Sequence, residues 1–303
     1  MKRWLGFAAV LLLAAAALVL GERRQAVARV SPDPVVYFIA DTEREVSRLV
    51  ATATRLSDEE EIRIGGELAA QYGQTAPLTG DDAVIEAYVQ KVGLQIGARA
   101  QRRLPYKFHY IPDRGFVNAF ALPGGHIFIG AGLIALMDSE DQLAGVLGHE
   151  VEHVDHYHCA ERVQLEARLR QLNLGVVGAL ISIPVEVFQA GYSKDQELEA
   201  DSEGTRLAAK AGYAPEGPVR LFEKFARLER EASQPARTPQ EEAARAALQT
   251  LQGYFRSHPP AAERIAHLRR TLPTEIWNRT AERPLQVAQY FPATPHAAGS
   301  ESK

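Results

Sequence analysis

Cysteine is nearly absent from this sequence of 303 residues. Cys159 is the single one, so no disulfide can form within the chain and no cysteine-based zinc cage is available. Any metal site must therefore use histidine and carboxylate side chains. A lone thiol is compatible with either side of a bacterial membrane and assigns no compartment. Cys159 itself is predicted to be a small, apolar helix residue.

A surplus of positive charge is also lacking. The formal net charge is −4 and the isoelectric point is near 6.2. Lysine and arginine do not gather into one long stripe, whereas nucleic-acid-binding proteins typically present a basic face. We therefore expect no nucleic-acid partner.

A long apolar run without charge lies at the N-terminus. Lys2 and Arg3 precede an apolar segment from Trp4 to Leu20, which is near the lower limit for crossing a bilayer and slightly longer than a usual signal sequence. No cysteine follows it for lipid attachment. Residues 1–24 are predicted to be a signal peptide or an uncleaved membrane anchor, with the anchor favoured. We expect the remainder on the periplasmic side of a bacterial cell envelope, tethered or secreted.

Most of the remaining chain has helical periodicity. A linker and a first helix are expected in residues 25–56, and Ser57 is placed to cap a second helix. A third helix is expected over 81–98. Alternating residues then predict three short strands at 106–111, 116–122 and 126–129. The fold class is therefore a mainly helical α+β fold with one small sheet.

The helix that follows these strands carries a His-Glu-x-x-His motif. Ser139 is a good cap, and the helix is expected from Glu140 to at least Tyr157. His149 and His153 share one helix face because they are four residues apart, so both imidazoles could hold one metal ion. Glu150 would stand beside them as a general base for a metal-activated water.

A later helix, capped by Ser193, carries two acids that are four residues apart. Glu197 and Asp201 lie on one face of it. Glu197 is the candidate third ligand, which gives a His₂Glu set for one Zn²⁺ per chain. Asp201 is placed to accept the free ring N–H of a ligating histidine. Glu199 points elsewhere on the helix and is expected to be solvated.

Other histidines are assigned to the surface. His156 and His158 fall in the motif helix, and His156 could approach the metal face, but a solvent-facing helix residue is the favoured interpretation. His109 and His126 are expected to be strand-surface residues, because neither has a partner at metal-ligand spacing.

The motifs together resemble the M48 family of zinc metallopeptidases, and in particular its exported bacterial branch. The matching segments run through most of residues 57–268, and their order is specific. They are Asn118 to Gly125, His149 to His153, Glu197 to Asp201, and Ala211-Gly212-Tyr213. The resemblance predicts one gluzincin-type peptidase domain at 57–271.

What the resemblance implies for the site agrees with the residues themselves. His149, His153 and Glu197 would hold zinc, with Glu150 as general base. The strand at Asn118, Ala119 and Phe120 would be the sheet edge along which an extended peptide substrate pairs. Such an edge offers unpaired backbone N–H and C=O groups.

The C-terminal part adds two further candidate residues. Helices are expected over 215–230 and 241–255, with a polar tail at 272–303. A His-Pro element at His258 also resembles this family branch. His258 could reach the open zinc position at rest or donate to an oxyanion during reaction, and a plain helix-start residue is an equally weighted alternative. Arg264 is expected to brace the acidic cluster. No tetratricopeptide repeats are expected after Thr271.

Three functions remain open at this point. The favoured one is a zinc-dependent endopeptidase that cleaves unfolded or misassembled cell-envelope proteins and contacts the membrane through its N-terminal segment if that segment is uncleaved. The first alternative is a non-proteolytic envelope chaperone or assembly factor with a structural or latched zinc site. The second is a metal-buffering or scaffold protein, which one tightly held ion would argue against. The apolar segment 174–190 is interpreted as a buried helix or a flap over the cleft, with a membrane-dipping or substrate-binding element as the alternative.

Overall fold

The computed structural model divides the chain into two compact units, Met1–Arg48 and Leu49–Lys303, and everything described below belongs to the second. The described residues are 56–72, 77–174, 184–233, 254, 258–277 and 282–291. Several predicted segments lie outside them: the anchor at 1–24, the linker and first helix (all but Leu56), most of the apolar segment 174–190, nearly all of the helix over 241–255, and much of the polar tail. Among the helices that are described, none combines the length and the apolar character needed to cross a membrane.

A small mixed sheet forms as the alternating residues predict. Its strands are β1 (Lys107–Ile111), β2 (Ala119–Leu122) and β3 (His126–Gly130), in the order β1-β3-β2. β1 and β3 are parallel, whereas β2 and β3 are antiparallel. The second strand begins three residues later than expected, because the amide of Phe116 donates to the carbonyl of Asp113 in a preceding turn, at 3.1 Å. β2 is therefore a short edge strand.

Two helices that precede the sheet in the chain pack against it. They are α3 (Asp58–Tyr72), which contacts the turn after β2, and α4 (Gly80–Gly97), which contacts β1. The expected cap of α3 is present, because the Glu60 amide donates to Ser57 Oγ at 3.2 Å and the Ser57 amide donates to Glu60 Oε2 at 2.9 Å. These contacts fix the start of α3.

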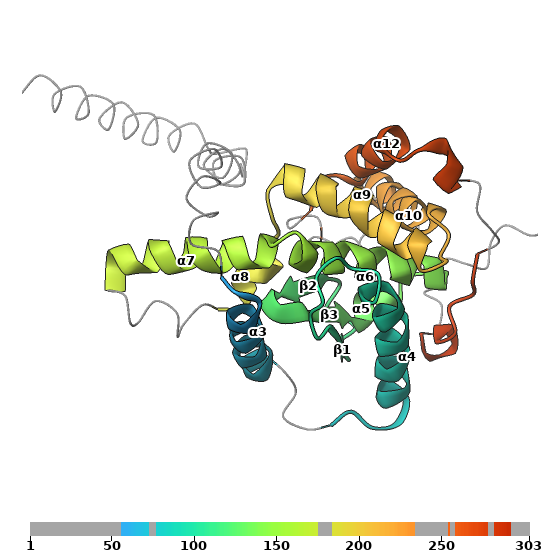
Figure 1. The fold of residues 1–303 in the computed structure, drawn as a ribbon. Helices are drawn as coiled ribbons and strands as arrows, with labels where there is room; N and C mark the ends of the chain where they lie inside the picture. Colours follow the sequence, from blue (N-terminus) through green and yellow to red (C-terminus); the bar gives the residue numbers. More distant parts are fainter. Residues whose placement is uncertain are drawn as a thin grey trace, which may run out of the picture. The chain divides into compact units, whose positions relative to one another are not determined.

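The motif helix α6 (Glu140–Asp155) lies at the centre, and all its residues are buried. It runs between the sheet on one side and α9 and α10 on the other, preceded by the short α5 (Ala131–Ile134) (Figure 1). The Gln142 amide donates to Ser139 Oγ at 3.3 Å, as the cap predicts. The prediction of a helix to at least Tyr157 is wrong, because Tyr157 has a left-handed φ of 63° and ends the helix two residues earlier.

Further helices follow in the same unit. Those that the structure describes are α7 (His158–Leu174), α8 (Glu186–Gln189), α9 (Lys194–Lys210), α10 (Glu216–Ser233) and α12 (Ala261–Thr271). Short 3₁₀ turns complete the described chain at Pro123–Gly125, Thr274–Trp277 and Ala288–Tyr290. The expected mainly helical α+β fold is confirmed.

Two glycines let α6 and α9 touch along their backbones. A Cβ placed on Gly204 would lie 2.5 Å from the backbone nitrogen of His149, and one on Gly148 would lie 2.5 Å from the carbonyl oxygen of Gly204. Neither contact can be relieved by a side-chain rotation, because both partners are backbone atoms. The spacing of the two helices therefore depends on both glycines.

We expect Gly204→Ala to lower the free energy of unfolding by about 1–3 kcal/mol, since the added methyl group overpacks the crossing. The measurement is denaturant unfolding followed by circular dichroism. Gly66→Ala on α3 is the matched control, because nothing lies within 4 Å of its added Cβ. Both changes gain about 1 kcal/mol of helix propensity, so their difference isolates the crossing. Equal stabilities of the two variants would contradict the prediction.

Candidate metal centre

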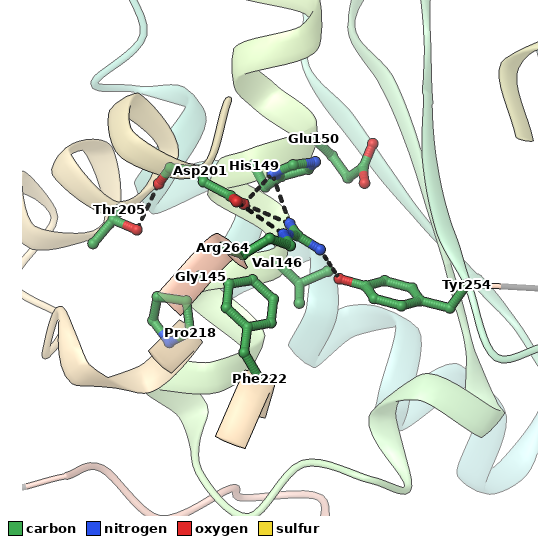
Figure 2. Close-up of a pocket in the computed structure, with 10 residues that line it drawn as sticks. All are labelled: Gly145, Val146, His149, Glu150, Asp201, Thr205, Pro218, Phe222, Tyr254 and Arg264. Carbon is green, nitrogen blue, oxygen red and sulfur yellow. Dashed lines mark hydrogen bonds and ion pairs between the residues drawn. The ribbon is translucent and has the colours of Figure 1, made fainter. Parts of the chain in front are cut away.

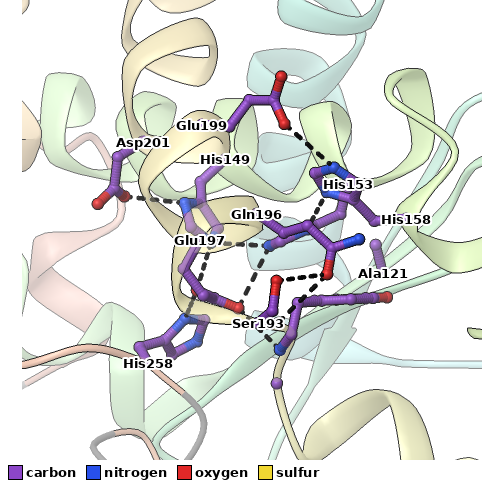
Figure 3. A network of polar contacts seen from close by, with 12 residues as sticks. Ala121, His149, His153, His158, Ser193, Gln196, Glu197, Glu199, Asp201 and His258 are labelled. Carbon is purple, nitrogen blue, oxygen red and sulfur yellow. Dashed lines mark hydrogen bonds and ion pairs between the residues drawn. The ribbon is translucent and has the colours of Figure 1, made fainter. Parts of the chain in front are cut away.

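Two imidazoles from α6 and one carboxylate from α9 converge inside the protein (Figure 3). The Nε2 atoms of His149 and His153 are 3.1 Å apart. Glu197 places Oε2 3.3 Å from Nε2 of His149 and Oε1 3.7 Å from Nε2 of His153. All three side chains are buried. The structure thus brings together the three residues that the sequence proposed as ligands.

A fourth group reaches the same carboxylate from the C-terminal part of the chain. Nδ1 of His258 lies 2.5 Å from Oε2 of Glu197. His149, Glu197 and His258 each offer one ligand atom, and these atoms lie within 4.8 Å of one another. His258 is therefore part of the cluster and is not a solvent-exposed helix-start residue.

The protonation of His153 and Glu197 suits a cation. Burial and the neighbouring imidazoles hold the pKa of His153 well below its usual value, which leaves a ring nitrogen free to bind. Burial alone would raise the pKa of Glu197, but the charge of His258 and the hydrogen bond from His149 outweigh it and hold that pKa well below its usual range. Neutral imidazoles and a carboxylate are the donor set that zinc prefers when no thiolate is present.

A buried ion pair orients the first of these imidazoles. Oδ1 of Asp201 lies 2.9 Å from Nδ1 of His149, and the Arg264 guanidinium donates to both oxygens of the same carboxylate (Figure 2). Arg264 also donates to the hydroxyl of Tyr254 at 2.6 Å. Burial lowers the pKa of His149, but hydrogen bonds to Asp201 and Glu197 outweigh it and raise the pKa to about 9. With its Nδ1 held by Asp201, His149 directs Nε2 toward Glu197.

Glu150 lies next to the cluster without joining it. Its carboxylate is turned away from the Asp201–Arg264 pair (Figure 2) and lines a small pocket with Val146 and Phe222. Burial raises the pKa of Glu150 to about 7, against the opposing charge of His149. A carboxyl group with a pKa near neutrality can both accept and return a proton.

The proposed substrate strand lies beside the motif helix. β2 is an edge of the sheet and packs against α6. The side chains of Ala119 and Phe120 are buried, and the Phe120 ring stacks on Phe128 with centroids 5.0 Å apart. Oδ1 of Asn118 is buried without a hydrogen-bond partner among the described residues. These side chains belong to the core, so a peptide would pair with the backbone of this edge.

Sequence reasoning missed one aromatic neighbour of the cluster. The Tyr192 ring stacks on His153 with centroids 4.1 Å apart, and its amide donates to Oε1 of Glu197 at 3.0 Å. Its hydroxyl lies 3.2 Å from Sγ of the buried Cys159, which is a structural residue as predicted. No local pattern could have identified the ring contact, because His153 and Cys159 are distant from Tyr192 in the sequence.

The prediction for His156 was wrong, and that for Glu199 was incomplete. His156 caps the end of α6 instead of lying on a helix face, and it is half-buried. The side chain of Glu199 is 45% exposed, yet it lies 3.2 Å from His156 and 3.5 Å from His158. Hydrogen bonding to Glu199 and the charge of Glu152 outweigh burial and raise the pKa of His156 to about 9.

The two strand histidines do not approach the cluster. His109 and His126 lie on adjacent strands, with Nε2 of the first 3.1 Å from Nδ1 of the second. Burial lowers the pKa of His109 to about 4. Neither belongs to a metal-binding group among the described residues, as expected. His126, however, is buried and not at the surface.

Three relatives are similar to more than half of this chain. The beta-barrel assembly-enhancing proteases of Yersinia pestis and Escherichia coli (strain K12) are 29% and 28% identical over 59% and 61% of this chain. The chain spans only 40% and 41% of their own lengths. The metalloprotease LoiP of Escherichia coli (strain K12) is 29% identical over 54% of this chain and 61% of its own length.

A family model places the chain more firmly than any single relative does. The model for peptidase family M48 matches residues 82–272. This stretch contains both helices of the cluster, the edge strand and His258. Because the match covers more than half of the sequence, the chain belongs to peptidase family M48, a family of metalloendopeptidases.

Proposed function

We propose that this protein is a zinc-dependent endopeptidase that cleaves unfolded or misassembled cell-envelope proteins on the periplasmic side of a bacterial envelope. The observation that carries the proposal is the convergence of His149, His153 and Glu197, with Glu150 beside them on the same helix. A buffering or purely structural site has no need of that additional buried acid.

His149, His153 and Glu197 would hold one zinc ion, and His258 offers a ligand atom close to those of His149 and Glu197. Bound zinc supplies a Lewis acid that polarises a peptide carbonyl and makes water more acidic. Asp201 and Arg264 fix the orientation of His149, so the donor set is arranged before any ion arrives. Such support raises metal affinity by roughly 10–100-fold in comparable sites.

Glu150 supplies the proton transfer. Its carboxylate accepts a proton from the attacking water and returns it to the nitrogen of the leaving amine. Burial makes this exchange possible near neutral pH, because it raises the pKa of Glu150 to about 7. A peptide paired along the β2 edge would lie next to α6, which carries Glu150.

Three observations indicate the substrate class. Two relatives are named for assistance to beta-barrel assembly, and the sequence begins with a segment predicted to be an export signal or anchor. An open sheet edge binds extended backbone, which unfolded chains expose and folded ones conceal. Unfolded or misassembled envelope proteins meet these conditions.

One observation favours a second function, a non-proteolytic chaperone with a latched site. Nδ1 of His258 lies 2.5 Å from the proposed ligand Glu197, where it can block the approach of substrate. We assign this contact to a resting state of the protease, because a permanently latched chaperone would gain nothing from Glu150.

Glu150→Gln should reduce cleavage of an unfolded protein by at least about a hundredfold, because it removes the general base. Zinc content should stay the same, since Glu150 is not among the ligand atoms. The measurement is digestion of a denatured substrate with and without chelator, beside metal analysis. Full activity of this variant would refute the proposed mechanism.

His153→Ala and Glu197→Ala should each lose zinc, because a tetrahedral site with one protein ligand fewer binds much more weakly. Metal analysis of purified protein after dialysis measures the loss. Glu161→Gln is a suitable control, since Glu161 lies outside both metal-binding groups of the described residues. The ligand assignment fails if both variants retain as much zinc as the wild type.

His258→Ala tests the latch. Loss of a charge-assisted hydrogen bond of about 1.5–3 kcal/mol should raise the cleavage rate on the order of tenfold, since 1.4 kcal/mol corresponds to a factor of ten. Initial rates on an unfolded substrate measure the effect. A fall of about a hundredfold or more would instead assign His258 to the oxyanion, and no activity in either protein would favour the chaperone.

A further inference from the structure

We propose that His156, His158 and Glu199 form a second divalent-cation site, separate from the cluster around Glu197. The three residues come from the end of α6, the first position of α7 and the middle of α9. Each offers one ligand atom, and these atoms lie within 4.8 Å of one another. Figure 3 shows Glu199 and His158 on the far side of His153 from His258.

The His156 and His158 rings each direct one nitrogen toward the carboxylate of Glu199. Oε1 of Glu199 lies 3.2 Å from Nδ1 of His156, and Oε2 lies 3.5 Å from Nε2 of His158. The other nitrogen of each ring already has a neighbour, Glu152 for His156 at 3.2 Å and His153 for His158 at 2.9 Å. The nitrogens that remain for an ion therefore converge on one carboxylate.

A buried acid lies on the other side of the His156 ring. Glu152 is 3% exposed, and its Oε2 pairs with Nε2 of His156 at 3.2 Å, without the geometry of a hydrogen bond. A carboxylate in this position orients the imidazole of a metal ligand. An ion on Nδ1 of His156 would leave the Nε2–H directed at Glu152, the carboxylate–histidine–metal arrangement common in metal sites.

The donor set indicates the class of ion. Two imidazoles and one carboxylate suit zinc and similar first-row divalent ions, and do not suit calcium or magnesium. The ion enters from solvent, because the Glu199 side chain is 45% exposed. A site with an exposed ligand binds more weakly than the fully buried one, so it fills only after the first.

Occupation of this site opposes the first one, a step that rests on the proposed function. Only one hydrogen fits between Nδ1 of His153 and Nδ1 of His158, which are 2.9 Å apart. While both rings are neutral, one of them must therefore carry its hydrogen on Nε2. That ring cannot also bind an ion through Nε2. Filling the second site thus weakens the hold of His153 on the first ion and inhibits cleavage.

The stoichiometry of zinc binding tests the site without any activity measurement. Full-length wild type, titrated with zinc alone under equilibrium dialysis, should take up two ions with separate affinities. His156→Gln should weaken the second by at least about tenfold. His109→Gln is the matched control, because His109 contacts the strand histidine His126 and Phe128 and belongs to neither metal-binding group of the described residues, and it should keep both ions. One ion in the wild type, or an unchanged second affinity in His156→Gln, overturns the proposal.

Two further variants keep the test decisive. Glu199→Gln should weaken the second zinc ion in the same way, and it changes an exposed side chain. If circular dichroism shows that His156→Gln folds poorly, Glu199→Gln therefore still tests the site. Glu197→Ala should lose the tight ion and retain the weaker one. Loss of both ions in Glu197→Ala shows that the second site does not exist by itself. Failure of the proposed protease function would be seen in a different measurement, as full cleavage activity of Glu150→Gln.

Inhibition by excess zinc tests the coupling. The ratio of activity at excess zinc to activity at one equivalent is compared within each protein, so differences in basal rate cancel. Wild type and His109→Gln should be inhibited, and His156→Gln should need about tenfold more zinc for the same inhibition. Equal inhibition of His156→Gln and wild type would overturn the antagonism between the two sites.

Discussion

Two helix backbones touch where α6 crosses α9, and the candidate metal centre depends on that contact. Gly148 and Gly204 leave no room for a side chain between them. The crossing lies one residue from His149 and brings the first turn of α9, with Glu197, against the two imidazoles. A wider spacing would separate the carboxylate from both rings. The donor set is therefore a consequence of helix packing as much as of residue type.

Burial of the charges on Arg264 and Asp201 is tolerated because each is the partner of the other. Arg264 is fully enclosed and binds Asp201 through two nitrogens, while Asp201 also holds His149. A buried charge that lost its partner would cost several kcal/mol, about 3–5 in comparable cases. The same pairing that makes burial tolerable also fixes the ring of His149. Structural support and preparation of the site are thus achieved by one network.

The early end of α6 separates two histidine clusters that one continuous helix would have merged. Tyr157 adopts a left-handed conformation, after which α7 starts at His158. His149 and His153 remain on the helix, whereas His156 and His158 turn toward Glu199. The contact between His153 and His158 still joins the two groups. One short break in a helix thus separates the two groups of histidines and also leaves them in contact.

Local sequence determined the elements and the principal candidates. Caps at Ser57 and Ser139, the alternation of the strands and the four-residue spacing of His149 and His153 are short-range patterns, and the structure contains all of them. The spacing of Glu197 and Asp201 was equally local. Such features follow from the period of a helix or a strand, which any segment carries within itself.

Only the tertiary structure decided how these segments meet. Tyr192 stacks on His153, Tyr254 binds Arg264, and Glu199 pairs with two histidines, although each pair is distant in sequence or interrupted by a turn. The end of α6 at Asp155 also had no clear signal, because a left-handed residue other than glycine costs energy that only the surrounding packing can repay. Sequence by itself therefore determined which residues could bind a metal. Packing decided which of them share a site, since the distance between helices is set by contacts that no single segment contains.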